Sequence, residues 1–292
     1  MRDLGLTLAG GGNRSFYQQA LLEAWGQRLW PRVAAVSCVS AGAAIAVLTF
    51  SGRADAARTH WDGLRKGLTK NLDLARVLSR EPIAPHGAIY RSTMLHALEE
   101  GGLSKLRETP FPIYVLCALP PRGVPSTLST WMGLLGYSLE KKIDPRILHP
   151  RVGAKLGFRA YAVDARECES PAEIADLVLA SSSTPPFTPL GSFRGLRLLD
   201  GGIVDNAPAA LVEQESAVRK NLVLLTRPYP HGVTGEHGAR LYIEPSGPVP
   251  IARWDYRESA NVEATLALGR ADAARYAGVL DAWLAKDLAA AS

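Results

Sequence analysis

Apolar and polar positions along this chain fall into segments that predict alternating strands and helices. A short apolar run over Leu4–Ala9 predicts a buried strand, and Phe16–Trp30 carries its apolar residues at helical spacing. A second β-prone run, Val33–Cys38, leads at once into the alanine-rich apolar segment Ala41–Phe50. Strand, glycine turn, helix, strand, sharp turn and buried helix are the beginning of an α/β sheet with parallel strands.

The remainder of the chain extends this pattern. Further strands are predicted over Ile113–Ala118, Phe158–Val163, Leu222–Thr226 and Leu241–Ile243. Further helices are predicted over Ala54–Leu68, Tyr90–Glu100, Pro171–Ala180, Ala209–Arg219 and the C-terminal stretch Asn261–Leu288. Because no internal repeat and no Pro/Gly/Ser-rich linker divides the sequence, we expect residues 1–292 to form a single domain.

One segment breaks the alternation. Thr127–Leu139 is apolar and aromatic, and Glu140-Lys141-Lys142 follows it. One interpretation is a core helix with a solvated end. The other is a cap, within residues 121–155, that lines an acyl tunnel or touches lipid with its lysines. The cap interpretation predicts that deleting Thr127–Leu139 leaves the fold intact and alters the preference for chain length.

The charge balance narrows the classes of partner. The 33 basic and 28 acidic residues give a net charge of +5, and the charges are scattered. Such a pattern is typical of a solvated surface, with weak attraction to an anionic membrane face as the alternative. Since the chain has no Lys/Arg stripe and no zinc-finger or RNA-binding signature, we expect no nucleic-acid partner. No oligomeric state is predicted.

The cysteines and histidines indicate neither a metal nor a cofactor. Cys38, Cys117 and Cys168 are widely separated and lack the spacing of a disulfide framework or a metal site. The start, Met1-Arg2-Asp3-Leu4, does not resemble a signal peptide, and no window reaches about 18 uninterrupted apolar residues. We therefore expect a cytoplasmic protein, with peripheral contact at a membrane as a further option.

The sequence Cys38-Val39-Ser40-Ala41-Gly42 marks a turn between a predicted strand and the alanine-rich helix. A serine hydroxyl becomes a nucleophile when a tight strand-to-helix turn exposes it and a base accepts its proton. The neighbours must be small because the turn packs strand against helix, and Cys38, Ala41 and Gly42 are small. Ser40 is therefore a candidate nucleophile, although a pentapeptide this degenerate also fits a plain packing turn.

A glycine loop, Gly10-Gly11-Gly12-Asn13-Arg14, follows the first strand. Acyl transfer places negative charge on a carbonyl oxygen, and backbone N–H groups at a helix N-terminus stabilise that charge. A dinucleotide-binding turn is the competing interpretation. Ser15 stands where its third glycine belongs, however, and Trp30–Val36 offers no carboxylate for a ribose. We expect the loop to form an oxyanion hole, and a plain tight turn stays the other interpretation.

The third turn is Leu199-Asp200-Gly201-Gly202. An aspartate before glycine is commonly a turn residue that binds its own backbone. With a reference pKa of about 3.9, an aspartate is also ionised at neutral pH, and it could accept a serine proton directly if the two oxygens lie within about 3 Å. Asp205 and Asn206, just beyond, are expected to shape the loop.

The three turns together resemble those of the patatin-like phospholipases, which carry G-G-G-x-[RK]-G, then G-x-S-x-G, then D-G-[GA]. The matching segments here are Gly10–Ser15, Cys38–Gly42 and Asp200–Gly202. Two flanking segments, Ala180–Pro189 and Asp205–Pro208, also resemble family sequences. The resemblance covers residues 4–52 and 171–226.

This resemblance implies a three-layer α/β/α sandwich with a mostly parallel central sheet and no cofactor. It also implies a lipid acyl hydrolase, acting as a phospholipase A, lysophospholipase or carboxylic ester hydrolase through an acyl-enzyme on a Ser40–Asp200 dyad. Arg14 matches the family's basic position, as a residue that fixes the loop or lies near an anionic head group. Two positions depart from the pattern, since Cys38 replaces the first glycine of the serine motif and Ser15 the last glycine of the loop.

Two other functions stay open. The first is a triad esterase that adds His231 or His237, both within the Pro/Gly-rich segment Pro228–Gly238, to the serine and aspartate. The second is a catalytically inactive binding or regulatory protein with the same fold, which the altered glycine positions Cys38 and Ser15 leave open.

Overall fold

The computed structural model describes residues 2–73, 83–124, 128–129, 131–133, 144, 146–149, 152–185 and 187–286. Most of Thr127–Leu139 lies outside these residues, so the core-helix and cap interpretations of that segment both stay predictions. The predicted C-terminal helix Asn261–Leu288 also runs past the described residues at its end.

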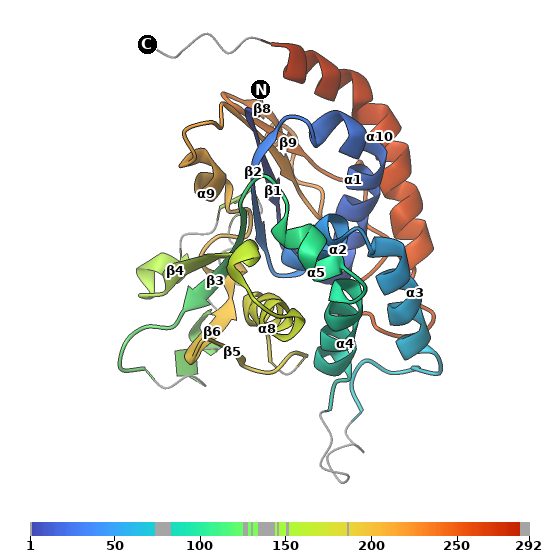
Figure 1. Cartoon of the computed structure of the whole chain (residues 1–292), viewed down its shortest axis with the longest axis vertical. Helices are drawn as coiled ribbons and strands as arrows, with labels where there is room; N and C mark the ends of the chain where they lie inside the picture. Colours follow the sequence, from blue (N-terminus) through green and yellow to red (C-terminus); the bar gives the residue numbers. More distant parts are fainter. Residues whose placement is uncertain are drawn as a thin grey trace.

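A mixed sheet forms the centre of the molecule (Figure 1), with the strand order β5-β6-β3-β2-β1-β7-β9-β8 and β4 also paired with β3. Its parallel strands are β1 (Leu4–Leu8), β2 (Val33–Val39), β3 (Ile113–Leu119), β7 (Lys220–Leu224) and β9 (Arg240–Ile243). The antiparallel strands β4 (Arg159–Asp164), β5 (Gly191–Phe193), β6 (Leu196–Asp200) and β8 (Gly235–His237) flank them. The predicted α/β class with a parallel centre is confirmed.

Helices cover both faces of this sheet. One face carries most of them: α1 (Phe16–Leu29), α2 (Ala41–Ser51), α3 (Ala54–Arg65), α4 (His86–Leu98), α5 (Gly102–Arg107), α8 (Pro171–Ser181) and α10 (Val262–Ala285). The other face carries α9 (Ala209–Glu213), which packs against β1, β2 and β7. In Figure 1, α9 lies on the opposite side of the sheet from α1 and α10, which contact each other. The result is three layers.

Successive residues of a strand point to opposite faces of a sheet, and this alternation divides the core. Leu4, Leu6 and Leu8 of β1 join the large apolar cluster with α1 and α2. The face under α9 holds a smaller cluster, in which Val223 of β7 packs with Ala207. Polar residues also lie on that second face. Hydrogen bonds therefore stabilise the packing of this face in addition to apolar contacts.

The element boundaries differ from the predicted ones in a few places. The helix predicted over Ala209–Arg219 ends at Glu213, because the chain turns back and the Arg219 and Lys220 N–H groups donate to Asp3 O, at 2.8 and 3.2 Å, at the entry to β7. The short elements α5, α7 (Val152–Lys155), β5 and β8 were not predicted. Four residues or fewer give too little periodicity to recognise, which accounts for α7, β5 and β8.

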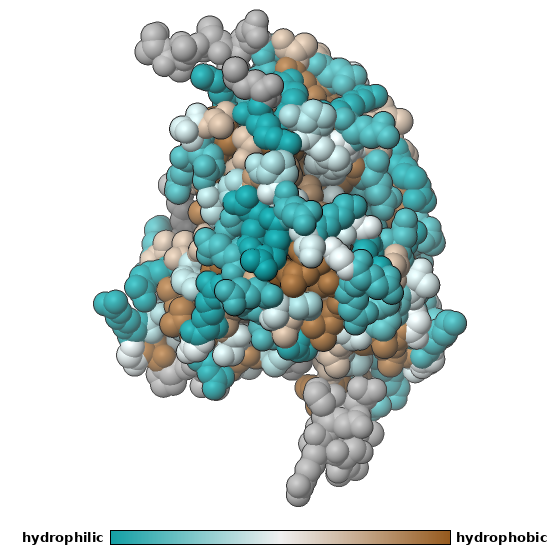
Figure 2. Space-filling view, in the orientation of Figure 1, coloured by the Kyte–Doolittle hydropathy of each residue, from teal (hydrophilic) through white to brown (hydrophobic). Residues whose placement is uncertain are grey.

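Figure 2 shows hydrophilic residues spread over most of the visible face, with hydrophobic areas between them. This distribution is typical of a solvated surface. None of the described helices is both long enough and apolar enough to cross a membrane. The described residues also contain no cluster of His, Cys, Asp and Glu side chains that could hold a metal ion.

Candidate active site

Ser40 lies in the sharp turn between β2 and α2. Its backbone has φ 53° and ψ −131°, a left-handed conformation that costs a non-glycine residue about 1–3 kcal/mol. The surrounding contacts hold this turn: Ser40 N–H donates to Ser181 Oγ at 2.8 Å, and Ser181 Oγ donates to Leu116 O at 2.6 Å. A Cβ at Gly42 would lie 2.5 Å from Leu8 O, so only glycine lets α2 approach β1 this closely. The turn therefore presents the serine side chain at the N-terminus of α2.

Asp200 reaches Ser40 because β6 takes the place of β2 along one edge of β3. β2 pairs with β3 as far as Leu116, and β6 then pairs with Cys117 and Ala118. The opposite edge of β3 is occupied by β4 over the same residues, so β6 must lie on the β2 side. The end of β2, next to Ser40, therefore meets the end of β6 at Asp200.

The two oxygens of the Asp200 carboxylate have different partners. Oδ2 accepts a hydrogen bond from Ser40 Oγ at 2.8 Å, and Oδ1 accepts one from Gly202 N–H at 2.7 Å. The same side chain thus closes its own turn and contacts the serine, so a turn role does not exclude the predicted role as a base. Ser40 is 5% exposed, so this contact is shielded from solvent.

The glycine loop 10–14 passes beside Ser40, and two of its amides are engaged. Gly10 N–H donates to Asn206 O at 3.0 Å, and Asn13 N–H donates to Arg253 O at 3.0 Å. In the described part of the chain the N–H groups of Gly11 and Gly12 have no acceptor. Arg14 Nε donates to Gly11 O at 3.3 Å, so its side chain braces the loop from within.

Two cavities meet at Ser40, which lines both. The apolar chamber, about 60 Å³, follows one side of α2 and is lined among others by Ala44, Ile45, Leu48, Trp61 and Met94. The polar chamber, about 260 Å³, is lined among others by Gly11, Gly12, Thr184, Asn206 and Arg253. Gly12, Arg253 and Trp254 border both chambers. The serine hydroxyl thus lies between a small apolar pocket and a larger polar one.

The two residues that depart from the family pattern are both buried. Burial raises the pKa of the Cys38 thiol, which packs within the sheet and contacts Tyr114 O at 3.4 Å. Ser15 is 1% exposed and lines the apolar chamber, and its hydroxyl has no hydrogen-bond partner among the described residues. Both substitutions are accommodated in the fold, but Ser15 brings an unsatisfied polar group to the pocket.

The two histidines considered for a triad are exposed. His237 is on β8, where its ring packs against that of Tyr242 with centroids 5.8 Å apart. β1, β7 and β9 separate β8 from the β2 edge at which Asp200 lies. At about 4.8 Å per strand this is a lateral distance of roughly 19 Å, far beyond a hydrogen bond.

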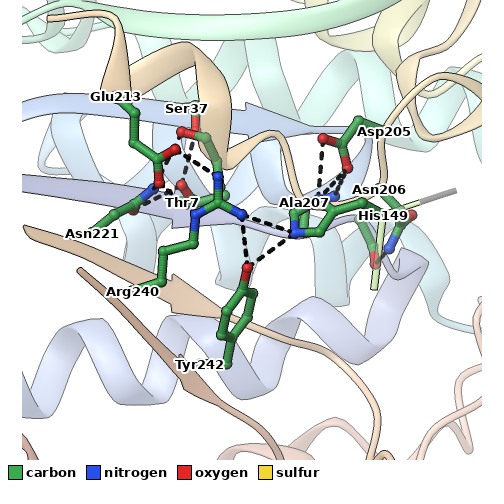
Figure 3. A network of polar contacts seen from close by, with 12 residues as sticks. Thr7, Ser37, His149, Asp205, Asn206, Ala207, Glu213, Asn221, Arg240 and Tyr242 are labelled. Atoms are coloured by element: carbon green, nitrogen blue, oxygen red, sulfur yellow. Dashed lines mark hydrogen bonds and ion pairs between the residues drawn. The ribbon is translucent and has the colours of Figure 1, made fainter. Parts of the chain in front are cut away.

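A network of polar side chains lies on the α9 side of the sheet (Figure 3). Thr7 of β1 contacts Ser37 of β2 and donates to Asn221 of β7, each at 3.0 Å. Asn221 donates in turn to Glu213 of α9 at 3.0 Å, and Glu213 binds Arg240. This part was not predicted from the sequence; polar residues inside otherwise apolar strands are the signal that could have found it.

The network continues to the loop after Asp200 through a histidine that had no recognised role. His149 Nδ1 lies 3.0 Å from Asp205 Oδ1, and His149 Nε2 lies 3.0 Å from the Tyr242 hydroxyl. Arg253 was missed likewise, because nothing in the local sequence marks either residue. Only the tertiary structure brings them to the site.

The comparison with protein families agrees with these features. The model of the patatin-like phospholipase family matches residues 6–212, which include the glycine loop, Ser40 and Asp200. Curated proteins gave no match. Among solved structures, VipD from Legionella pneumophila is similar with a TM-score of 0.45 and 13% sequence identity, over 96% of this chain and 67% of that chain. With well over half of its 292 residues matched, the chain belongs to the patatin-like phospholipase family.

Proposed function

We propose that this protein is a lipid acyl hydrolase that cleaves carboxylic ester bonds with a Ser40–Asp200 dyad. Members of the family are generally hydrolases of lipid esters, and this membership supports the reaction class. The observation that carries the dyad is the 2.8 Å hydrogen bond from Ser40 Oγ to Asp200 Oδ2. The position of His237, which three intervening strands separate from the β2 edge at Asp200, favours a dyad over a triad.

The reaction follows from this contact. Asp200 accepts the proton of Ser40 as Oγ bonds to the ester carbonyl carbon, and the carbonyl oxygen becomes an oxyanion. Collapse of this intermediate breaks the bond to the alcohol, which takes the proton from Asp200. Water then attacks the acyl-enzyme while Asp200 accepts its proton, and Ser40 leaves with that proton as the acid is released.

The oxyanion is stabilised by the N–H groups of Gly11 and Gly12. These two residues border the polar chamber beside Ser40, and their amides have no acceptor in the described part of the chain. Gly10 and Asn13 instead use their amides to hold the loop. Of the five loop residues expected to form the oxyanion hole, we therefore assign the donors to the second and third, Gly11 and Gly12.

The two chambers orient the substrate. An alkyl chain fits the apolar chamber along α2, and the alcohol part of the ester extends into the polar chamber. Burial of the acyl chain supplies roughly 0.8 kcal/mol per CH₂ group.

Arg253 favours a phosphate on the alcohol part. Within the described part of the chain its guanidinium makes no hydrogen bond or ion pair, and Asp200 is the one carboxylate among the described residues that line the polar chamber. Burial raises the pKa of the Tyr229 phenol, and the positive charge of three nearby guanidinium groups opposes that rise. These groups belong to Arg227, Arg14 and Arg253. Phosphate pairs well with arginine, so phospholipids or lysophospholipids fit this site better than neutral glycerolipids.

Peripheral contact with a membrane is supported by two exposed side chains. Leu128 and Trp131 are 52% and 63% exposed, and a Cβ at nearby Gly133 would lie 2.8 Å from Ile203, which lines the polar chamber. Apolar and aromatic side chains exposed beside a lipid-binding site suit the membrane interface.

The test is hydrolysis of p-nitrophenyl esters of graded chain length by the full chain, with Ser40→Ala and Asp200→Asn as variants. We expect each variant to lose at least about 10³-fold in kcat and Ser40→Ala to lose labelling by a fluorophosphonate. Ser192→Ala, an exposed serine on β5, is the matched control and should retain full activity. If Ser40→Ala keeps its activity, the dyad is wrong. If the wild type is inert and unlabelled, the binding-protein alternative is favoured.

A further inference from the structure

We propose that His149 is a positioning residue for this hydrolysis, because it anchors the segment 205–207 that holds the glycine loop against Ser40. The inference rests on the proposed function for its kinetic consequence, but the anchoring itself is a separate claim. Figure 3 shows His149 between Asp205 on one side and Arg240 and Tyr242 on the other.

The first step is the hold of Asn206 on Gly10. Gly10 N–H donates to Asn206 O at 3.0 Å, and Asn206 Nδ2 donates back to Gly10 O at 3.2 Å. Thr226 Oγ1 donates to the same carbonyl at 2.8 Å. A Cβ at Gly10 would lie 2.9 Å from Asn206 Oδ1 and 3.2 Å from Ser40 Cβ. Asn206 therefore sets the distance between the loop and the serine.

In the second step, Asp205 stabilises the turn of its own segment through two hydrogen bonds. Asp205 N–H donates to Gly201 O at 3.0 Å, and Asp205 Oδ1 accepts from Ala207 N–H at 2.9 Å. These contacts keep the segment in its turn but do not attach it to the sheet. His149 provides an attachment from outside the segment, with Nδ1 at 3.0 and 3.2 Å from the two Asp205 carboxylate oxygens.

The third step is the fixed orientation of the imidazole. Arg240 Nη1 donates to the Tyr242 hydroxyl at 3.0 Å and lies 3.4 Å from His149 Nε2. A guanidinium can only donate, so the hydroxyl accepts from Arg240 and donates its own hydrogen to Nε2, 3.0 Å away. The ring hydrogen of the neutral histidine is then on Nδ1 and donates to Asp205. Hydrogen bonding to Glu213 raises the pKa of Arg240. The guanidinium that orients this series of hydrogen bonds therefore stays positively charged.

The anchor joins distant parts of the chain. Arg240 and Tyr242 are on β9, outside the residues 6–212 that match the family, and His149 precedes α7. The network therefore attaches the loop after Asp200 to the far side of the sheet, independently of the contacts that bind Asp200 to Ser40.

The expected consequence is a loss of rate with little change in binding. The amides of Gly11 and Gly12 contact charge that develops only in the transition state, so a displaced loop lowers kcat more than it changes KM. A displacement near 1 Å typically costs up to about 10²-fold, and we expect His149→Ala to lose roughly 10- to 100-fold in kcat. His149→Asn should recover most of this loss, because its amide can donate to Asp205 as Nδ1 does.

The experiment compares the full chain with His149→Ala, His149→Asn, Tyr242→Phe and the control His237→Ala. The control removes an exposed imidazole that packs on the same Tyr242 ring without a hydrogen bond to it. Two readouts are needed: kcat and KM on the p-nitrophenyl ester that wild type hydrolyses best, and hydrogen exchange of the amides in residues 8–14 and 204–208. We expect faster exchange of both peptides in His149→Ala, intermediate exchange in Tyr242→Phe, and wild-type behaviour in His237→Ala.

Several results would overturn the proposal. The first is an unchanged kcat in folded His149→Ala. The second is a loss of kcat in His149→Ala that is equally large in His149→Asn. The third is a loss of kcat that the control His237→Ala shows as well. If His149→Ala does not fold, Tyr242→Phe carries the test, and wild-type exchange in both peptides counts against the anchor. An inert wild type would refute the hydrolase proposal instead, and the exchange measurement would still decide whether His149 holds the loop.

Discussion

Replacing Gly12 by alanine tests the geometry of the glycine loop most directly. Gly12 has φ +57°, and a Cβ there would lie 2.3 Å from Arg253 O. The left-handed conformation costs alanine about 1–2 kcal/mol relative to glycine. To bring this Cβ and Arg253 O to an ordinary van der Waals distance, the loop and the segment of Arg253 must move apart by about 1 Å. A movement of this size costs about 10²-fold in rate, and loss of one oxyanion donor costs about 10²–10³-fold.

Gly232→Ala is the matched control for this change. Gly232 has φ +80°, and nothing lies within 4 Å of the position of its Cβ. It therefore shares the backbone strain of Gly12→Ala but not the contact. Both variants should lose about 1–2 kcal/mol in urea unfolding, with a further loss in Gly12→Ala alone. Only Gly12→Ala should lose about 10²-fold or more in kcat on the ester substrate.

Either of two results would refute this reasoning. If Gly12→Ala hydrolyses the ester within about threefold of wild type, its amide does not stabilise the oxyanion. If Gly232→Ala loses as much activity as Gly12→Ala, the effect comes from general strain and not from the contact with Arg253.

Four further outcomes are expected. Arg253→Gln should lower kcat/KM on phosphatidylglycerol vesicles about tenfold or more and leave the p-nitrophenyl ester rate unchanged; equal losses on both would contradict a role for Arg253 in binding phosphate. Ser15→Ala removes a buried hydroxyl without a partner among the described residues and should raise the unfolding free energy by about 1 kcal/mol, whereas a lower value would mean that the hydroxyl is satisfied. Trp131→Ala should weaken sedimentation with anionic vesicles without changing the rate on a soluble ester. The Arg32 guanidinium lowers the pKa of Asp3 by a hydrogen bond, so this pair stabilises the fold above the ordinary aspartate pKa and the stability is lost as pH falls through the lowered value. Asp3→Asn should therefore be less stable at pH 7 and lose less stability in an acid titration below about pH 5.

The first half of the site could be predicted from sequence because it is local. β1, α1, β2 and α2 are consecutive, and the hydrophobic period of each element together with the glycine turns between them determines where Ser40 is placed. The same patterns predicted the parallel centre of the sheet. The motif at Asp200 indicated an aspartate that could act as a base, and the structure places it 2.8 Å from Ser40 Oγ.

The remaining parts of the site depend on contacts between distant segments. The pairing of β6 with β3 extends over Cys117 and Ala118 only, and no pattern in either strand specifies it. His149 and Arg253 lie in segments without periodicity, and each reaches the site through a bond to another loop. The helix predicted to Arg219 ended early because Asp3 O, at the other end of the chain, accepts the N–H groups that follow.

The short pairing of β6 with β3 makes the position of Asp200 depend on a hairpin far from the serine. β5 and β6 are joined at Phe193 and Leu196, and the two residues between them, Arg194 and Gly195, both have positive φ, 47° and 75°. Such a turn fixes which residues of the two strands face each other, and a slip of one residue turns every side chain of a strand to the opposite face. One inserted residue in this hairpin could point Asp200 away from Ser40 while leaving the serine turn, the glycine loop and both helical layers as they are. The proposed hydrolysis would then be lost through one added residue, with no functional group removed.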